Sequence, residues 1–116
     1  MNQPQGIPSV DVQEAASRTG ADGPASPVIL DVREPDEVAT VRIDGGLHVP
    51  MSALPERIDE IPRDRPLLVL CAMGGRSAAV TGYLLRSGWT DVTNIDGGIT
   101  AWERAGLPVT RGATPG

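Results

Sequence analysis

The sequence predicts an α/β fold with a mainly parallel sheet that helices cover on both faces. Two apolar runs, residues 28–30 and 67–70, are continuous and lack the alternation of a half-exposed strand. Such runs are typical of parallel strands that are buried on both sides. Segments with helical patterns lie between the strand-like runs, which favours a parallel sheet. With 116 residues, 40% of them hydrophobic, the chain is long enough for one core, and we expect a single domain over residues 1–116.

The first third of the chain is expected to form two short helices around one strand. A helix begins after Asp11, which stands at the capping-box offset from Glu14. An exposed loop at 20–27, rich in Gly, Pro and Ala, leads into the strand at 28–30. A proline suited to the first turn of a helix then predicts a short helix over 34–39.

The clearest helix is expected over 76–87. Val80 and Leu84 are spaced to lie on one face of this helix, and Gly88 supplies a stop. The other elements expected in this part of the chain are strands at 47–49 and 92–95 and a short helix at 99–105. The segment 52–61 is helix-like but interrupted by Pro55, which predicts a turn followed by a short helix from Pro55.

The composition excludes several classes of function. Ten basic against fifteen acidic residues give a net charge of −5, which disfavours nucleic acid or an anionic membrane as the partner. The chain has no lysine, so Schiff-base chemistry and a phosphate-loop lysine are excluded. One cysteine and one histidine cannot build a structural zinc site, a disulfide or an iron–sulfur cluster. We therefore expect no metal and no organic cofactor.

The sequence also predicts a cytoplasmic protein. Residues 1–10 have neither the basic head nor the apolar stretch of a signal peptide. The longest apolar run, 67–73, is far shorter than the ~20 residues that a membrane helix needs. In a reducing compartment Cys71 is expected to be a free thiol.

One segment combines the features of a reactive thiol. Cys71 ends a buried strand and precedes a turn in which Gly74 and Gly75 permit positive φ, so that backbone amides can form an anion-binding nest. The start of the next helix adds its dipole and Arg76 adds a charge, while no Asp or Glu occurs between 65 and 90. These effects lower the pKa of a thiol, and they predict that Cys71 is a thiolate nucleophile.

The spacing between Cys71 and Arg76 distinguishes two kinds of chemistry. Four residues separate them, whereas cysteine-dependent phosphatases place one residue more between their Cys and Arg. A tighter loop favours a persulfide sulfur over a tetrahedral phosphoryl group. A phosphatase or an arsenate reductase stays open as an alternative, which hydrolysis of an aryl phosphate would support.

Three motifs in order make the chain resemble a single-domain rhodanese, or thiosulfate sulfurtransferase, module. They are DVREP at 31–35, CAMGGRS at 71–77, and DGGITAW at 96–102 followed by GLPV at 106–109. The resemblance covers about residues 7–109 and implies a three-layer α/β/α sandwich with a central, mainly parallel sheet. It also implies that Cys71 is the nucleophile and that loop amides hold its persulfide. The implied substrate-binding residues are Ala72, Met73, Gly74, Gly75, Arg76 and Ser77.

One stretch departs from the family pattern. Where the family usually has a Gly-His-Ile-Pro-Gly-Ala-like run, this chain has Arg42 in place of the His and Asp44 in place of the Pro. The contacts of that loop therefore cannot be carried over.

The predicted function is transfer of sulfane sulfur through a Cys71 persulfide. The donor is thiosulfate or a similar small anion, and the acceptor is cyanide, a thiol or a protein cysteine. The alternative is a sulfur-relay or regulatory module that works with a protein partner and has little turnover of its own.

The roles of the remaining candidates follow from their positions. Asp31 and Arg33 stand at a strand end and are expected to support the active-site loop. His48 lies inside a strand-like run, which favours a structural role over catalysis. Ser77 either contacts the sulfur or only caps the helix. Trp89 and Trp102 are expected to pack in the core or at its rim. Gly97 and Gly98 are expected to allow a close backbone approach at a helix start.

Overall fold

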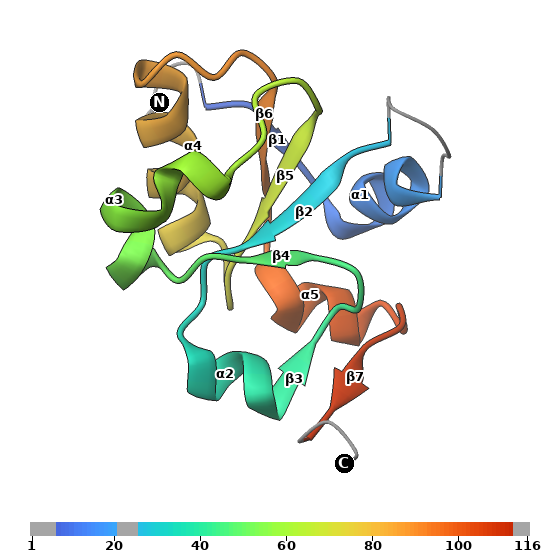
Figure 1. Cartoon of the computed structure of the whole chain (residues 1–116). Helices are drawn as coiled ribbons and strands as arrows, with labels where there is room; N and C mark the ends of the chain where they lie inside the picture. The colour runs from blue at the N-terminus through green and yellow to red at the C-terminus, as the bar shows by residue number, and fades with distance from the viewer. Residues whose placement is uncertain (1–6, 21–25, 113–116) are drawn as a thin grey trace.

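The computed structural model, which describes residues 7–20 and 26–112, confirms the α/β class (Figure 1). Its central sheet has five strands in the order β1-β6-β5-β2-β4, and every neighbouring pair runs parallel. These strands are β1 (Ser9–Val10), β2 (Val28–Asp31), β4 (Leu47–His48), β5 (Leu67–Leu70) and β6 (Val92–Ile95). Most of the loop predicted at 20–27 lies outside the described residues.

Helices cover both faces of this sheet, as the three-layer arrangement requires. Figure 1 shows α3 and α4 on one side of the sheet and α1 and α5 on the other. The helices are α1 (Val12–Thr19), α2 (Pro35–Thr40), α3 (Leu54–Arg57), α4 (Gly75–Arg86) and α5 (Gly98–Arg104). Among the helices described, none is both long and apolar enough to cross a membrane.

The central strand β5 explains why its sequence is apolar without alternation. Leu67 and Val69 pack with α3 and α4, whereas Leu68 and Leu70 point to the opposite face and pack with α1 and α5. All four side chains are at most 1% exposed. Two cores, one on each face, therefore hold β5 in place up to the residue that follows it.

The helix ends agree with the capping residues of the sequence. The Asp11 carboxylate accepts the amide of Glu14 at 2.9 Å, which caps α1. The turn and the short helix expected from Pro55 correspond to a 3-10 turn at Met51–Ala53 and to α3. This helix is only one turn long, because a second 3-10 turn follows it at Ile58–Glu60. A proline in the first turn starts α3, but the segment does not continue as a regular α-helix.

Three short strands were not predicted: β1, β3 (Val41–Arg42) and β7 (Thr110–Arg111). Each has two residues, too few to show any periodicity. β3 and β7 pair antiparallel beside the main sheet, and β1 extends it at one edge (Figure 1).

Both tryptophans lie in the core, as predicted. Trp89 is 5% exposed and donates its indole N–H to the Pro62 carbonyl at 3.0 Å. Trp102 is 3% exposed and donates to the Pro108 carbonyl at 2.9 Å. The second bond ties α5 to the segment that follows it.

Candidate active site

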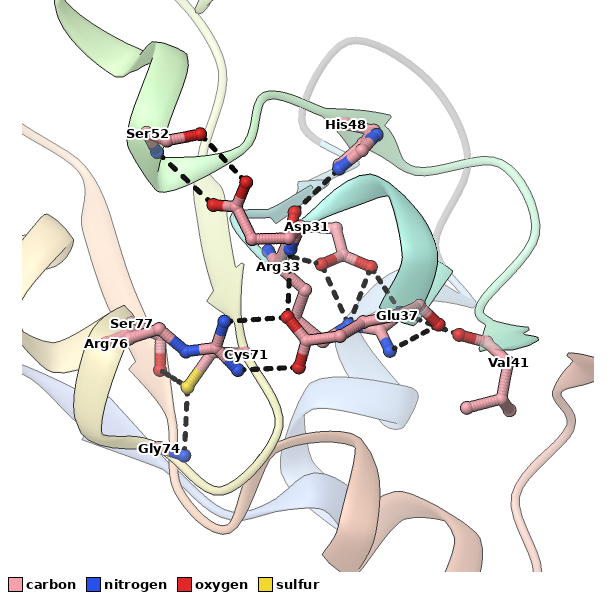
Figure 2. A network of polar contacts seen from close by, with 11 residues as sticks. Asp31, Arg33, Glu37, Val41, His48, Ser52, Cys71, Gly74, Arg76 and Ser77 are labelled. Atoms are coloured by element: carbon pink, nitrogen blue, oxygen red, sulfur yellow. Dashed lines mark hydrogen bonds and ion pairs between the residues drawn. The ribbon is translucent and has the colours of Figure 1, made fainter. Parts of the chain in front are cut away.

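Cys71 stands directly after β5, where the carboxyl ends of the parallel strands meet. Its side chain is 1% exposed, and among the described residues it is a free cysteine that forms no disulfide. The sulfur accepts the backbone N–H of Gly74 at 3.0 Å and lies 3.2 Å from the hydroxyl oxygen of Ser77 (Figure 2). Gly74 has φ +106° and precedes α4, so the turn closes back over the sulfur at the start of that helix.

Opposing effects act on the ionisation of this thiol. Burial disfavours the charged form and is the largest effect, which by itself raises the pKa of Cys71. Hydrogen bonds from the Ser77 side chain and from the backbone amides of Ser77, Gly74 and Met73 act in the other direction. Together the hydrogen bonds outweigh burial, and the pKa of Cys71 is lowered below its ordinary value. The loop therefore favours the thiolate, which is the nucleophilic form of cysteine.

The start of α5 determines how the loop presents its amides. The N–H groups of Ile99 and Thr100 donate to the carbonyls of Cys71 and Ala72 at 2.9 and 3.1 Å. In a trans peptide the carbonyl and the next N–H point in opposite directions. Because these two carbonyls point to α5, the amides of Ala72 and Met73 point away from it, and the Met73 amide is one of those that stabilise the Cys71 thiolate.

Gly98 allows this close approach. A Cβ at Gly98 would lie 2.5 Å from the Ala72 carbonyl oxygen and closer still to that of Cys71. Its φ of +58° is also a conformation that disfavours residues with a side chain. The close backbone approach expected for Gly97 and Gly98 at a helix start is confirmed at Gly98, the first residue of α5.

Arg76 has an internal partner. Its guanidinium donates to both carboxylate oxygens of Glu37, on α2, at 2.7 and 2.8 Å (Figure 2). This ion pair raises the pKa of Arg76 and lowers that of Glu37 to about 2. The sequence predicts that the full charge of Arg76 acts on the sulfur, but in the structure Glu37 neutralises much of that charge. Binding of a substrate anion by Arg76 stays a prediction.

Asp31 and Arg33 form a buried ion pair behind this contact. They are 6% and 2% exposed, and one guanidinium nitrogen lies 2.7 Å from the Asp31 carboxylate. Arg33 also donates to the carbonyls of Glu37 at 3.3 Å and Val41 at 2.8 Å, at the end of α2. The pair thereby holds α2, and α2 carries the partner of Arg76. This placement is consistent with the supporting role expected for Asp31 and Arg33.

The remaining candidates lie away from the sulfur. His48 has Nε2 2.7 Å from the Arg33 carbonyl oxygen, a structural contact at the end of β2 (Figure 2). Arg42 donates to the Gly112 carbonyl at 2.8 Å. The Asp44 carboxylate accepts the Thr110 hydroxyl at 2.6 Å. The stretch that departs from the family pattern therefore joins the segment around β7. Among the described residues, no group of three or more His, Cys, Asp or Glu side chains is placed to hold a metal.

Asn94 and Glu37 lie near the site but were not identified from the sequence. Ser77 contacts the sulfur, and its hydroxyl donates at 2.5 Å to Oδ1 of Asn94, which is 3% exposed. An amide inside a short buried strand is a signal, because buried polar groups need partners. Glu37 has no comparable signal, since its partner lies on another helix far along the chain.

The Glu37–Arg76 pair makes a prediction about acid stability. Near neutral pH, Glu37→Gln removes the ion pair with Arg76 and is expected to lower the free energy of unfolding. The loss should be only about 1 kcal/mol, because both side chains are about one-third exposed and water screens their charges. The pKa of Glu37 is depressed in the folded state, so the contribution is complete above pH 4.5 and is lost as the pH falls towards about 2.

Urea unfolding of both proteins at a series of pH values measures this contribution. The difference between wild type and Glu37→Gln should shrink over the acid range. A difference that does not depend on pH would contradict an ionic origin. Glu14→Gln, which removes an exposed pair with Arg18, is the control and should have the smaller effect.

The comparisons with known proteins agree with the geometry. The family model described as rhodanese-like domain matches residues 11–105. The chain is 42% identical to a sulfurtransferase of Allochromatium vinosum over 71% of its own length and 77% of that protein. It is 36% identical to thiosulfate sulfurtransferase GlpE of Stutzerimonas stutzeri, covering 68% of this chain and 72% of that one.

A solved structure has the same architecture. A rhodanese-related protein of Thermoplasma volcanium matches with a TM-score of 0.81 and 32% identity, over 90% of this chain and 98% of that chain. The family match extends from the start of α1 to the end of α5 and so includes the strand, the loop and both helices that surround Cys71. The chain belongs to the rhodanese-like domain family.

Proposed function

We propose that this protein is a sulfurtransferase in which Cys71 carries sulfane sulfur as a persulfide. The Cys71 thiolate attacks the outer sulfur of thiosulfate or a similar anionic donor. A bond forms between the two sulfurs, the sulfur–sulfur bond of thiosulfate breaks, and its electron pair leaves with sulfite. Cyanide, a small thiol or a protein cysteine then takes the outer sulfur and restores the thiolate, a ping-pong scheme.

The single observation that carries this proposal is the amide cradle around a thiol with a lowered pKa. A persulfide places its negative charge on the outer sulfur, where amides already oriented by α5 can donate to it. The names of the relatives support the transfer of sulfur, and one of them names thiosulfate as donor. Since the scheme needs a reduced thiol, we place the protein in a reducing compartment such as the cytoplasm.

A second candidate is sulfur relay to a protein partner with little free turnover. Met73 favours it, since this side chain is 74% exposed although it lies in the loop around the buried sulfur. Exposed methionines adapt to varied protein surfaces. Fast transfer from Cys71 to a purified partner, together with slow thiosulfate turnover, would support this candidate over the first.

Intact mass measurement tests the proposal. Protein treated with thiosulfate is expected to gain the mass of one sulfur atom, and cyanide is expected to remove it. Cys71→Ala is the control and should show no gain. If the wild type gains no sulfur from thiosulfate or from other sulfane donors, the proposal is wrong. Hydrolysis of an aryl phosphate that depends on Cys71 would favour a phosphatase instead.

A further inference from the structure

The hydroxyl of Ser77 lies between two groups that can accept a hydrogen bond from it. Its oxygen is 3.2 Å from the Cys71 sulfur and 2.5 Å from Oδ1 of Asn94. Ser77 on α4 and Asn94 on β6 are 0% and 3% exposed, so solvent does not replace either contact. A hydroxyl has one proton to donate, and only one of these neighbours can receive it at a time.

The direction of each proton follows from Asp96. Its carboxylate accepts but does not donate, and it lies 3.2 Å from Nδ2 of Asn94. The amide therefore turns its NH2 group to Asp96 and its oxygen to Ser77. Because this oxygen only accepts, the Ser77 hydroxyl donates to it, and the neutral Cys71 thiol donates to the Ser77 oxygen.

Ionisation of Cys71 reverses this order. The thiolate has no proton to donate. It can accept a hydrogen bond from the Ser77 hydroxyl only if that hydroxyl turns away from Asn94. Every buried side-chain nitrogen and oxygen in the described part of the chain has a hydrogen-bond partner, and this turn removes the donor from Oδ1. An unpaired buried acceptor opposes the turn.

We propose that Asn94 is a positioning residue that acts through Ser77, by competing with the Cys71 sulfur for the single hydroxyl proton. The competition limits how far Ser77 stabilises the thiolate of the resting protein. The role of Asn94 in sulfur transfer rests on the proposed function. In a Cys71 persulfide the charge lies on the outer sulfur, and the inner sulfur is a poor acceptor. The hydroxyl then donates to Asn94, which favours the loaded protein.

Arg76 and Arg33 do not depend on Asn94 for their positions. Each is held by its own partner: Arg76 of α4 by Glu37 of α2, and Arg33 by Asp31 at the end of β2. Asp96 loses its contact with the Asn94 amide, but it is exposed, so water can take the place of that donor. A change in the titration of Cys71 in such a variant therefore reports the hydroxyl proton of Ser77.

The test is the pH dependence of Cys71 alkylation by iodoacetamide, followed by intact mass. In Asn94→Leu the hydroxyl no longer has the Asn94 oxygen to donate to and can donate to the sulfur. The pKa of Cys71 should therefore fall by about one unit, which means about tenfold more thiolate than in the wild type at a pH below both pKa values. In Asn94→Asp the carboxylate is a stronger acceptor and adds a charge, so the pKa should rise. A purely structural role would move both variants in the same direction.

Ser77→Ala supplies the matched background. The change caused by Asn94→Leu should vanish when Ser77→Ala is also present, because no hydroxyl is left to redirect. If Asn94→Leu leaves the pKa unchanged, raises it, or lowers it equally without the Ser77 hydroxyl, the inference is overturned. Asn94→Val, which suits a strand, replaces Asn94→Leu if the latter does not fold. The titration uses no sulfur donor, so it can fail or succeed independently of sulfur loading.

Discussion

Gly98→Ala is expected to lower the rate of sulfur transfer by about 100-fold, because misplacement of a reacting group by about 1 Å costs that much. The new methyl group would overlap the carbonyl oxygens of Cys71 and Ala72. The start of α5 must then move away, and the bonds from Ile99 and Thr100 that orient the loop amides are lost. The variant should also be less stable, since a left-handed residue with a side chain costs about 1–2 kcal/mol before any overlap.

Gly106→Ala is the matched control for this prediction. Gly106 also has positive φ, at +76°, but a Cβ there would meet nothing within 4 Å. Gly106→Ala therefore introduces the unfavourable backbone conformation without any overlap. Steady-state sulfur transfer to cyanide and urea unfolding of both variants separate the two effects. Equal activities of Gly98→Ala and Gly106→Ala would show that the contact between α5 and the loop does not position the site.

Arg33→Met is expected to cause the largest loss of stability, about 3–5 kcal/mol, because it leaves a buried carboxylate without its cation. Asp31 is 6% exposed, and the carbonyls of Glu37 and Val41 lose a donor as well. Chemical unfolding measures the loss. Because α2 carries Glu37, the position of Arg76 should change too, and activity should fall together with stability.

Two comparisons test the cause of that loss. Arg18→Met removes an exposed pair with Glu14 and should cost no more than about 0.5 kcal/mol. The double variant Asp31→Leu with Arg33→Met removes both charges and should recover part of the stability lost in Arg33→Met alone. A single variant as stable as Arg18→Met would contradict the importance of the buried pair.

The α/β class could be predicted because its signals are local. The apolar run at 67–70 has no alternation, and that property alone indicates a strand covered on both faces. Cys71 could be singled out for the same reason, since strand, cysteine, glycines and helix start follow one another in the sequence. A close backbone approach at Gly97 and Gly98 could also be predicted, although the sequence does not say which backbone they approach.

The parts that were missed depend on contacts between distant segments. Glu37 and Arg76 form the ion pair that holds the loop arginine, but they are separated in the chain by three strands (β3, β4 and β5), several turns and α3. The same is true of β3 and β7, whose pairing is decided by the tertiary fold. Asn94 has its role because α4 places Ser77 against β6, which no local pattern contains.

The depth of the cysteine has a consequence for oxidative damage. With the side chain 1% exposed, two copies of the protein collide before their sulfur atoms approach the ~2 Å of a disulfide bond. Covalent dimers should therefore be absent after mild oxidation of the folded chain and appear only once the protein unfolds. The burial of Cys71 therefore protects the single thiol of the chain from coupling with a second copy of the protein.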